Sequence, residues 1–255
     1  MARTLIAGNW KMHNNASQAS FLVHRLQERI NIHRDVEVVL MPPMLTLQPM
    51  SMQIDRRKFR LGAQNAHFAD EGAFTGEVSM TMLRELVHYV LVGHSERRHV
   101  FGETDEMVAK KAAAAVRNEI SPIICVGETQ HERTQGETKQ VLHDQITVAL
   151  SDLTSRDIHD VVIAYEPVWA IGTGANAKPD QVEEAVKLIR NNIAHLYGKT
   201  AAARVRVLYG GSTNADNARS YLQLPGINGL LVGGASLNYH QFSDMVDTAF
   251  RLTKE

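Results

Sequence analysis

Short apolar runs alternate with amphipathic stretches along the chain. Eight runs rich in valine, isoleucine and leucine predict β-strands, at residues 4–9, 36–41, 60–65, 89–93, 122–127, 161–166, 205–210 and 227–233. Between them, apolar residues recur at spacings of three and four, as at Val182, Val186, Ile189 and Ile193. This spacing predicts helices with one buried face. Strand and helix therefore alternate throughout.

The alternation predicts a parallel sheet, because each helical crossover returns the chain to the same edge. The strands are almost continuously apolar, so we expect both faces of the sheet to be covered. Eight βα units in 255 residues predict an α/β fold, a closed (β/α)8 barrel, with residues 1–255 forming a single domain. A doubly wound open sheet is the alternative.

Composition narrows the class of partner. The chain has 27 basic and 28 acidic residues and a formal net charge of -1. We therefore expect no binding to nucleic acid or to an anionic membrane. Cys125 is the only cysteine, which excludes an internal disulfide and fits a cytoplasmic location. The apolar run before Asn9 is too short for the core of a signal peptide.

The carboxyl ends of barrel strands meet on one face, where such proteins carry their active sites. Polar or glycine-rich segments follow six of the eight predicted strands: Asn9 with Lys11, Asn65, His94 with Glu96, Glu166, residues 209–212 and residues 232–236. We therefore expect one site that contains a base, a cation, an imidazole and two glycine-rich cradles for an anion.

Glu166 ends a predicted strand and precedes the apolar segment "PVWAIG". A carboxylate that such a loop covers loses water and becomes a stronger base, so we expect a catalytic base; an ion pair with a neighbouring arginine is the alternative. His94 precedes "SERR", a predicted helix start. The helix dipole disfavours an imidazolium there, so we expect a neutral hydrogen-bond donor, with a surface histidine as the alternative.

Other candidates have structural alternatives of comparable weight. Glu96 lies beside Arg97 and Arg98, so a structural ion pair explains it as well as catalysis does, and we assign it a supporting role. Lys11 at the barrel mouth needs a bound anion, such as a substrate phosphate. The pairs Gly210–Gly211 and Gly233–Gly234 fit the phosphate site that barrels build after their last two strands, although tight turns would also explain them.

Two further motifs do not carry function. "GTGANA", residues 172–177, matches a dinucleotide fingerprint, but five residues separate it from the strand and Pro179 opens the helix later. His94 and His99 are five residues apart, off the helical face that zinc motifs use. We therefore expect neither a metal nor a cofactor.

Seven motifs together resemble the triosephosphate isomerase family and its TIM barrel: "AGNWKM", "GAFTGE", "VGHSERRHVFGETDE", "CVGE", "AYEPVWAIGTG", "YGGS" and "GLLVGGASL". The resemblance implies interconversion of dihydroxyacetone phosphate and glyceraldehyde 3-phosphate in glycolysis and gluconeogenesis. It implies catalysis by Glu166 as base, His94 as electrophile and Lys11 with Asn9 as substrate-binding groups. It further implies a phosphate held by backbone N–H groups, those of Gly172, Ser212, Gly233 and Gly234, and a closing loop at residues 167–177.

The chain also departs from this family. Residues 175–178 lack the usual lysine-led hinge and the hydroxyl before Pro179, Asn228 replaces a frequent aspartate, and His13 a frequent asparagine. Residues 65–77, with Thr75 near the tip, resemble the loop that the family inserts into a partner subunit. We therefore expect a homodimer. The alternatives are another phosphate-binding barrel enzyme, such as a sugar-phosphate epimerase, and a catalytically silent binding barrel.

Overall fold

The computed structural model describes residues 3–171 and 176–255, and these residues form a closed barrel of eight parallel strands in sequence order. The strands are Thr4–Asn9 (β1), Val36–Met41 (β2), Phe59–Ala63 (β3), Tyr89–Val92 (β4), Ser121–Val126 (β5), Val162–Tyr165 (β6), Arg206–Tyr209 (β7) and Gly229–Val232 (β8). The expected barrel is therefore confirmed.

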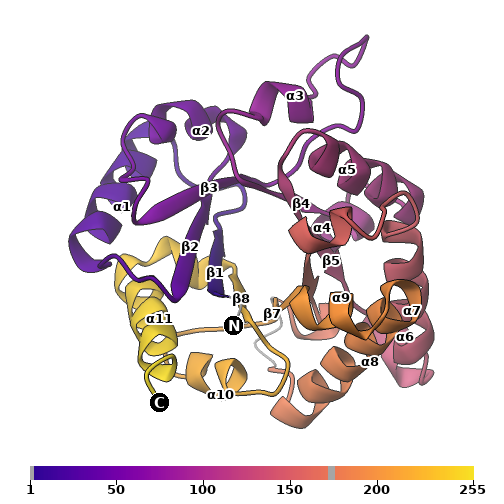
Figure 1. Ribbon diagram of the computed structural model, residues 1–255. Helices are drawn as coiled ribbons and strands as arrows, with labels where there is room; N and C mark the ends of the chain where they lie inside the picture. Colours follow the sequence, from indigo (N-terminus) through magenta and orange to yellow (C-terminus); the bar gives the residue numbers. More distant parts are fainter. Residues whose placement is uncertain (1–2, 172–175) are drawn as a thin grey trace.

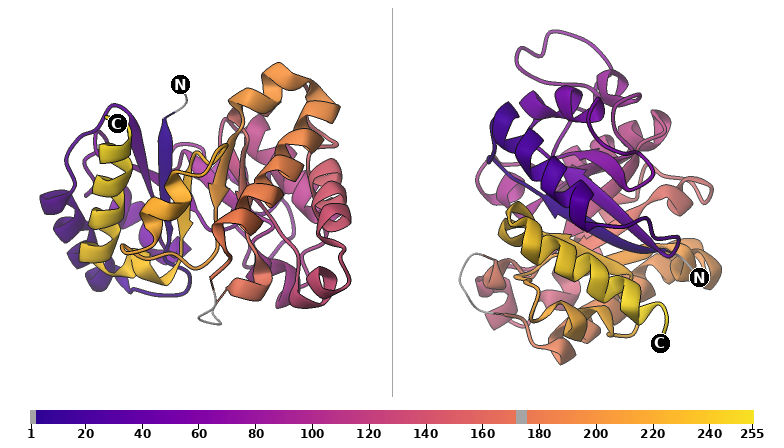
Figure 2. Two further views of the ribbon diagram at one scale, coloured as in Figure 1. Left: turned by 90° about the horizontal axis from the view of Figure 1, so that it is seen from below. Right: turned by 90° about the vertical axis from the view of Figure 1, so that its left-hand side faces the viewer.

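Helices surround the strands (Figures 1 and 2). They are Ala16–Arg29 (α1), Met44–Ser51 (α2), Met80–Leu83 (α3), Ser95–His99 (α4), Asp105–Arg117 (α5), Gln130–Thr134 (α6), Thr138–Ala149 (α7), Pro179–Tyr197 (α8), Lys199–Arg204 (α9), Ala218–Leu222 (α10) and Tyr239–Leu252 (α11). The described part of the chain also contains the 3-10 turns Asp157–Asp160 (η1), Val168–Ala170 (η2) and Gly234–Leu237 (η3). None of the helices in the described residues has both the length and the apolar composition that crossing a membrane requires.

Several predicted strands extend past the observed ends. The prediction included Gly93, Glu166, Gly210 and Gly233, whereas β4, β6, β7 and β8 each end one residue earlier. The physical reason is that the chain must leave the sheet there. Backbone hydrogen bonding between neighbouring segments can continue one residue past the end of a strand: the Glu166 N–H donates to the Val126 carbonyl oxygen at 2.8 Å. These four residues are therefore the first residues of the loops that follow the carboxyl ends of the strands.

Side chains fill both sides of the strands. Those that point inward form the barrel interior, and all are buried: Leu5, Ala7, Val39, Met41, Tyr89, Leu91, Ile123, Cys125, Val162, Ala164, Leu208 and Leu231. Those that point outward pack against the helices in a larger cluster. This two-sided burial explains why the strands lack a polar alternation. Burial also raises the pKa of the Cys125 thiol, which keeps it protonated.

An ion pair closes the interior at the amino-terminal ends of the strands. Arg206 Nη1 donates to Glu37 at 2.8 Å, and its Nη2 donates to Tyr89 Oη at 2.7 Å. The Tyr89 hydroxyl in turn donates to Glu37 at 2.9 Å. This network lies at the opposite end of the barrel from the loops that follow Glu166 and His94, so it contributes to the scaffold.

A second arginine joins α8 to α9 and to the segment that precedes β8. Arg190 donates to the carbonyl oxygen of Gly226 at 2.5 Å and to that of Ala202 at 2.7 Å. It also donates to Oδ1 of Asn228 at 2.8 Å, and this oxygen accepts the Val207 N–H at 3.0 Å. Burial lowers the pKa of Arg190. The unusual Asn228 is therefore a shared acceptor.

We predict that Asn228→Asp stabilises the fold. The carboxylate keeps both accepted bonds and gives the guanidinium a charged partner, which should raise the free energy of unfolding by about 1 kcal/mol. Urea denaturation measures this change. Asn228→Ala is the control, and it should be less stable than the parent because it removes both bonds. An Asn228→Asp variant no more stable than the parent would contradict the prediction.

Candidate active site

Seven of the eight residues predicted to catalyse or to bind substrate line one cavity of about 260 Å³ at the carboxyl ends of the strands, whereas Asn65 and Glu96 line the adjoining cavity. The lining of the 260 Å³ cavity is contributed by the segments after β1, β4, β6, β7 and β8, and includes Asn9, Lys11, His94, Glu166, Ser212, Gly233 and Gly234. The eighth predicted residue, Gly172, lies outside the described residues. Thr213 and Leu231 also line the cavity, although the sequence pattern offered no reason to select them.

Glu166 is buried at the end of β6, and two glycines make room for it. A Cβ on Gly127 would lie 1.7 Å from the Glu166 carbonyl oxygen, so any other residue there would force β5 and β6 apart. A Cβ on Gly210 would lie 3.0 Å from Glu166 Cγ. The backbone at Gly127 and at Gly210 therefore packs closely against Glu166 and fixes the position of its backbone and Cγ.

The carboxylate of Glu166 faces the imidazole of His94. Glu166 Oε1 lies 3.0 Å from His94 Nε2, and Oε2 accepts the Ser95 N–H at 2.8 Å. His94 Nδ1 accepts the Glu96 N–H at 3.3 Å. An Nδ1 that accepts a hydrogen bond places the ring proton on Nε2, where it points at the carboxylate.

The two side chains shift each other's titration. Burial raises the pKa of Glu166, but the charge of His94, the hydrogen bond to it and the Ser95 N–H outweigh burial and lower the pKa below its ordinary value. Burial lowers the pKa of His94, whereas Glu166 raises it and prevails. The sequence predicted a stronger base at Glu166 from burial and a neutral His94 from the helix dipole. Neither prediction included the contact between the two side chains, which lowers the pKa of Glu166 and raises that of His94.

Lys11 adopts a left-handed backbone conformation, with φ at 53°. Asn9 Oδ1 accepts its N–H at 3.0 Å, and Gln64 Nε2 donates to its carbonyl oxygen at 2.9 Å. Such a conformation costs roughly 1–2 kcal/mol for a residue other than glycine. The side chains of Asn9 and Gln64 hold the turn that directs the ammonium into the site.

The counter-charge of Lys11 is Glu96, at 2.5 Å. We expected Glu96 beside Arg97 and Arg98, but these arginines pair with other carboxylates: Arg97 with Glu103 at 2.7 Å and Arg98 with Asp105 at 2.5 Å. We also expected that Lys11 would need a bound anion, but the carboxylate of Glu96 already balances its charge. Adjacent residues on a helix point in different directions, which is why adjacency in sequence gave the wrong partner.

Backbone N–H groups at the far side of the cavity are available for an anion. Among residues 3–171 and 176–255, nothing accepts a hydrogen bond from the N–H groups of Ser212, Gly233 or Gly234. The Lys11 side chain passes close by, since a Cβ on Gly233 would lie 3.4 Å from Lys11 Cε. Free donors beside a cation are suited to a phosphate.

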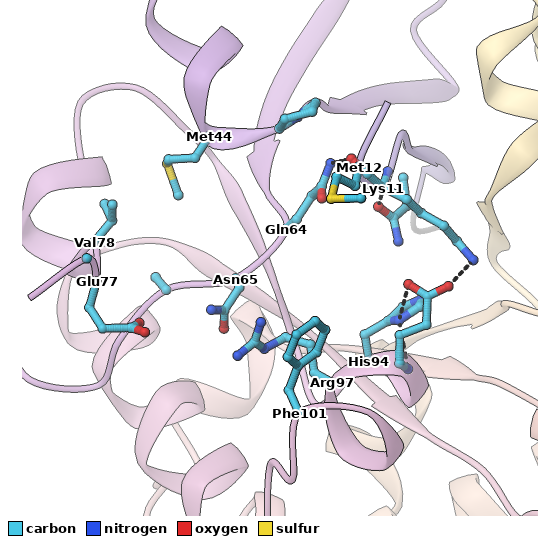
Figure 3. A pocket seen from close by; sticks show the side chains of 15 residues that line it. Lys11, Met12, Met44, Gln64, Asn65, Glu77, Val78, His94, Arg97 and Phe101 are labelled. Atoms are coloured by element: carbon cyan, nitrogen blue, oxygen red, sulfur yellow. Dashed lines mark hydrogen bonds and ion pairs between the residues drawn. The ribbon is translucent and has the colours of Figure 1, made fainter. Parts of the chain in front are cut away.

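A second cavity, of about 390 Å³, adjoins this site and shares Asn9, Lys11 and His94 with it. Figure 3 shows the side chains of Met12, Met44 and Phe101 around it. Met12 is 94% exposed and Phe101 is 68% exposed. Apolar side chains this exposed beside a polar site are typical of a surface that another protein covers.

Comparison with known proteins identifies the family. A sequence model described as triosephosphate isomerase matches residues 4–249. The chain belongs to the triosephosphate isomerase family. It is 48% identical over 250 residues to the triosephosphate isomerase of Caldanaerobacter subterraneus subsp. tengcongensis, covering 97% of this chain and all of the relative. It is 44% identical over 247 residues to that of Carboxydothermus hydrogenoformans, covering 96% of this chain and 98% of the relative.

Membership of the triosephosphate isomerase family confirms two expectations. The chain is an isomerase, and its function is that of the family, the interconversion of dihydroxyacetone phosphate and glyceraldehyde 3-phosphate. The roles of individual residues stay predictions. Sequence reasoning missed the Ser95 N–H and Gln64, because both act through backbone atoms that only the folded chain brings together.

We predict that His94→Gln raises the pKa of Glu166. Burial still opposes the carboxylate charge in this variant, while the imidazole that offsets burial is gone. Carbon-13 NMR of the labelled Glu166 carboxyl, assigned with Glu166→Gln, measures the titration midpoint. The exposed neighbour His99 serves as control, and His99→Gln should leave the midpoint unchanged. A midpoint in His94→Gln at or below the parent value would refute the prediction.

Proposed function

We propose that Glu166, His94 and Lys11 carry out the isomerisation, with Asn9 helping to bind the substrate. The observation that carries this proposal is the 3.0 Å contact between the Glu166 carboxylate and His94 Nε2 in a cavity that also contains free backbone donors. A base and a hydrogen-bond donor on adjacent sides of a small cavity suit proton transfer between neighbouring carbons.

In the proposed reaction, substrate separates Glu166 from His94. Glu166 removes a proton from C1 of dihydroxyacetone phosphate while the His94 Nε2–H hydrogen-bonds the C2 carbonyl oxygen as it becomes negative. Glu166 then returns the proton to C2, and a proton passes from O1 to O2 at His94. The enediolate lies between these steps. Lys11 adds positive charge beside the developing oxyanion, with Glu96 as its supporting partner.

We propose that the phosphate binds to Ser212, Gly233 and Gly234, and that Gly172 adds a donor from the predicted loop at residues 167–177. Bound phosphate supplies remote binding energy to the step at C1 and C2. The base of this loop is anchored, since Trp169 Nε1 donates to Glu128 at 2.9 Å. At its other end, Gln181 Oε1 accepts the Lys178 N–H at 2.9 Å, which is the half of a capping box that needs no hydroxyl at residue 178.

We further propose that the reaction needs no cofactor or metal and takes place in the cytoplasm, in glycolysis and gluconeogenesis. The chemistry supports the first part, because a base and fixed donors are sufficient to move a proton. The single cysteine and the balanced charge of the chain support the second.

We predict that Glu166→Gln lowers kcat by about 10² to 10⁴ and His94→Ala by about 10² to 10³. Both substitutions should leave the inhibition constant of inorganic phosphate nearly unchanged, because the phosphate donors come from other segments. A coupled assay with glyceraldehyde 3-phosphate in the presence of a chelator measures both effects. Parent activity lost in chelator would contradict the proposed metal independence, and unchanged turnover in either variant would remove that residue from the mechanism.

We propose that two chains form a homodimer through the loop around Thr75. The segment between β3 and α3 projects beyond the ring of helices (Figures 1 and 2). Residues 71–77 are exposed in it, Phe74 among them. The 390 Å³ cavity beside the active site offers a recess with a mixed lining, in which Met12, Met44 and Phe101 lie beside polar and charged residues. Insertion of this loop into the recess of a second chain would cover Met12 and Phe101.

We predict that Thr75→Arg weakens this dimer, because a longer, charged side chain at the tip of the loop would have to enter the recess that the proposed contact fills. Light scattering should give twice the chain mass of 28.4 kDa for the parent protein and a tenfold or greater rise in the dissociation constant for the variant. Ile32→Arg changes an exposed apolar residue of another segment and should stay dimeric. A parent protein of 28.4 kDa at assay concentrations would refute the homodimer.

A further inference from the structure

The five-residue helix α4 holds both of the groups proposed to react. Its first residue, Ser95, donates its N–H to Glu166, and the next, Glu96, donates its N–H to His94 Nδ1. Displacing this helix would therefore move the carboxylate and the imidazole together. A helix of a single turn has little stability of its own, so contacts with other elements must fix its position.

Arg98 supplies these contacts from the last turn of α4. Its Nε donates to the carbonyl oxygen of Gly93 at 2.7 Å, and its Nη2 to that of Cys125 at 3.2 Å. Its Nη1 pairs with Asp105, in the first turn of α5, at 2.5 Å. The guanidinium thus joins α4 to the ends of β4 and β5 and to α5, and its side chain is 10% exposed.

Gly93 is shaped around this side chain. It has a φ of 68°, in the left-handed region, and a Cβ there would lie 2.9 Å from Arg98 Nη2. Gly93, directly before His94, therefore accepts a hydrogen bond from Arg98 through its carbonyl oxygen. Because it has no Cβ, it also leaves room for the guanidinium. Lysine could not reproduce this arrangement, because one ammonium cannot hold three acceptors in the plane of a guanidinium.

We propose that Arg98, held by Asp105, is a positioning residue for the isomerisation: it sets the orientation of α4 and through it the distance between His94 and Glu166. Arg98 does not line the catalytic cavity. Its effect passes through the Gly93 carbonyl and through the Ser95 and Glu96 N–H groups. This inference rests on the proposed roles of His94 and Glu166.

The test compares Arg98→Met with Arg206→Met. Both remove an arginine that is ion-paired and mostly buried, but Arg206 lies at the amino-terminal end of the barrel, with Glu37 as its partner. We expect Arg98→Met to lower kcat by about 10- to 100-fold, because small misplacements of reacting groups have effects of this size. The inhibition constant of inorganic phosphate should change less than about twofold. Arg206→Met should be destabilised but retain the kcat of its folded fraction.

A spectroscopic measurement separates positioning from general destabilisation. Nitrogen-15 NMR of the His94 imidazole reports whether Nδ1 still accepts the Glu96 N–H. We expect the Nδ1 signal to move in Arg98→Met and to stay in place in Arg206→Met. Arg98→Lys should behave like Arg98→Met in this measurement.

A milder pair of variants applies if Arg98→Met does not fold. Asp105→Ala releases Nη1 and should lower kcat by about tenfold, whereas Asp105→Asn keeps an acceptor and should restore most of it. Unchanged kcat in Arg98→Met or in Asp105→Ala, or an equal loss in Arg206→Met, would overturn the inference. The parent protein in the same assay tests the proposed function separately: inactivity there would overturn the residue roles themselves.

Discussion

The contact between His94 and Glu166 spans a strand that belongs to neither residue. β5 lies between β4 and β6, so the two side chains come from strands that do not pair with each other. Gly127 directly follows β5, and because it carries no Cβ the Glu166 backbone can approach it closely. Parallel pairing brings the carboxyl end of every strand to the same face. The site is thus a property of the closed barrel.

The two ends of the barrel differ in whether their polar groups have hydrogen-bond partners. At the amino-terminal ends of the strands, Arg206 and Glu37 pair and Tyr89 completes their hydrogen bonds, so this end is electrostatically satisfied. At the other end the Ser212, Gly233 and Gly234 donors stay free within the described residues. Preorganised, unsatisfied donors favour an anionic ligand, since they need no rearrangement when it binds. The scaffold carries the stability, and the loops carry the unsatisfied groups.

Sequence patterns predicted the strands well because each strand is buried on both faces, and burial determines composition. They also selected polar residues that line the cavity, because residues such as Glu166 and His94 interrupt the apolar pattern at the strand ends. They failed where the answer depends on contacts between distant segments. The partner of Glu96 is Lys11, the titration of Glu166 depends on His94, and the turn at Lys11 depends on Gln64. None of these pairs has a spacing that a sequence motif records.

In the proposed mechanism, the left-handed backbone at Lys11 sets stability against activity. Glycine would adopt that conformation without a steric penalty, so it would relieve the turn while removing the ammonium that faces Glu96. A screen of this protein for heat resistance alone would therefore reward the loss of its own cation. Directed evolution of a more heat-stable variant therefore has to select for turnover in every round, because stability favours glycine at this position and activity favours lysine.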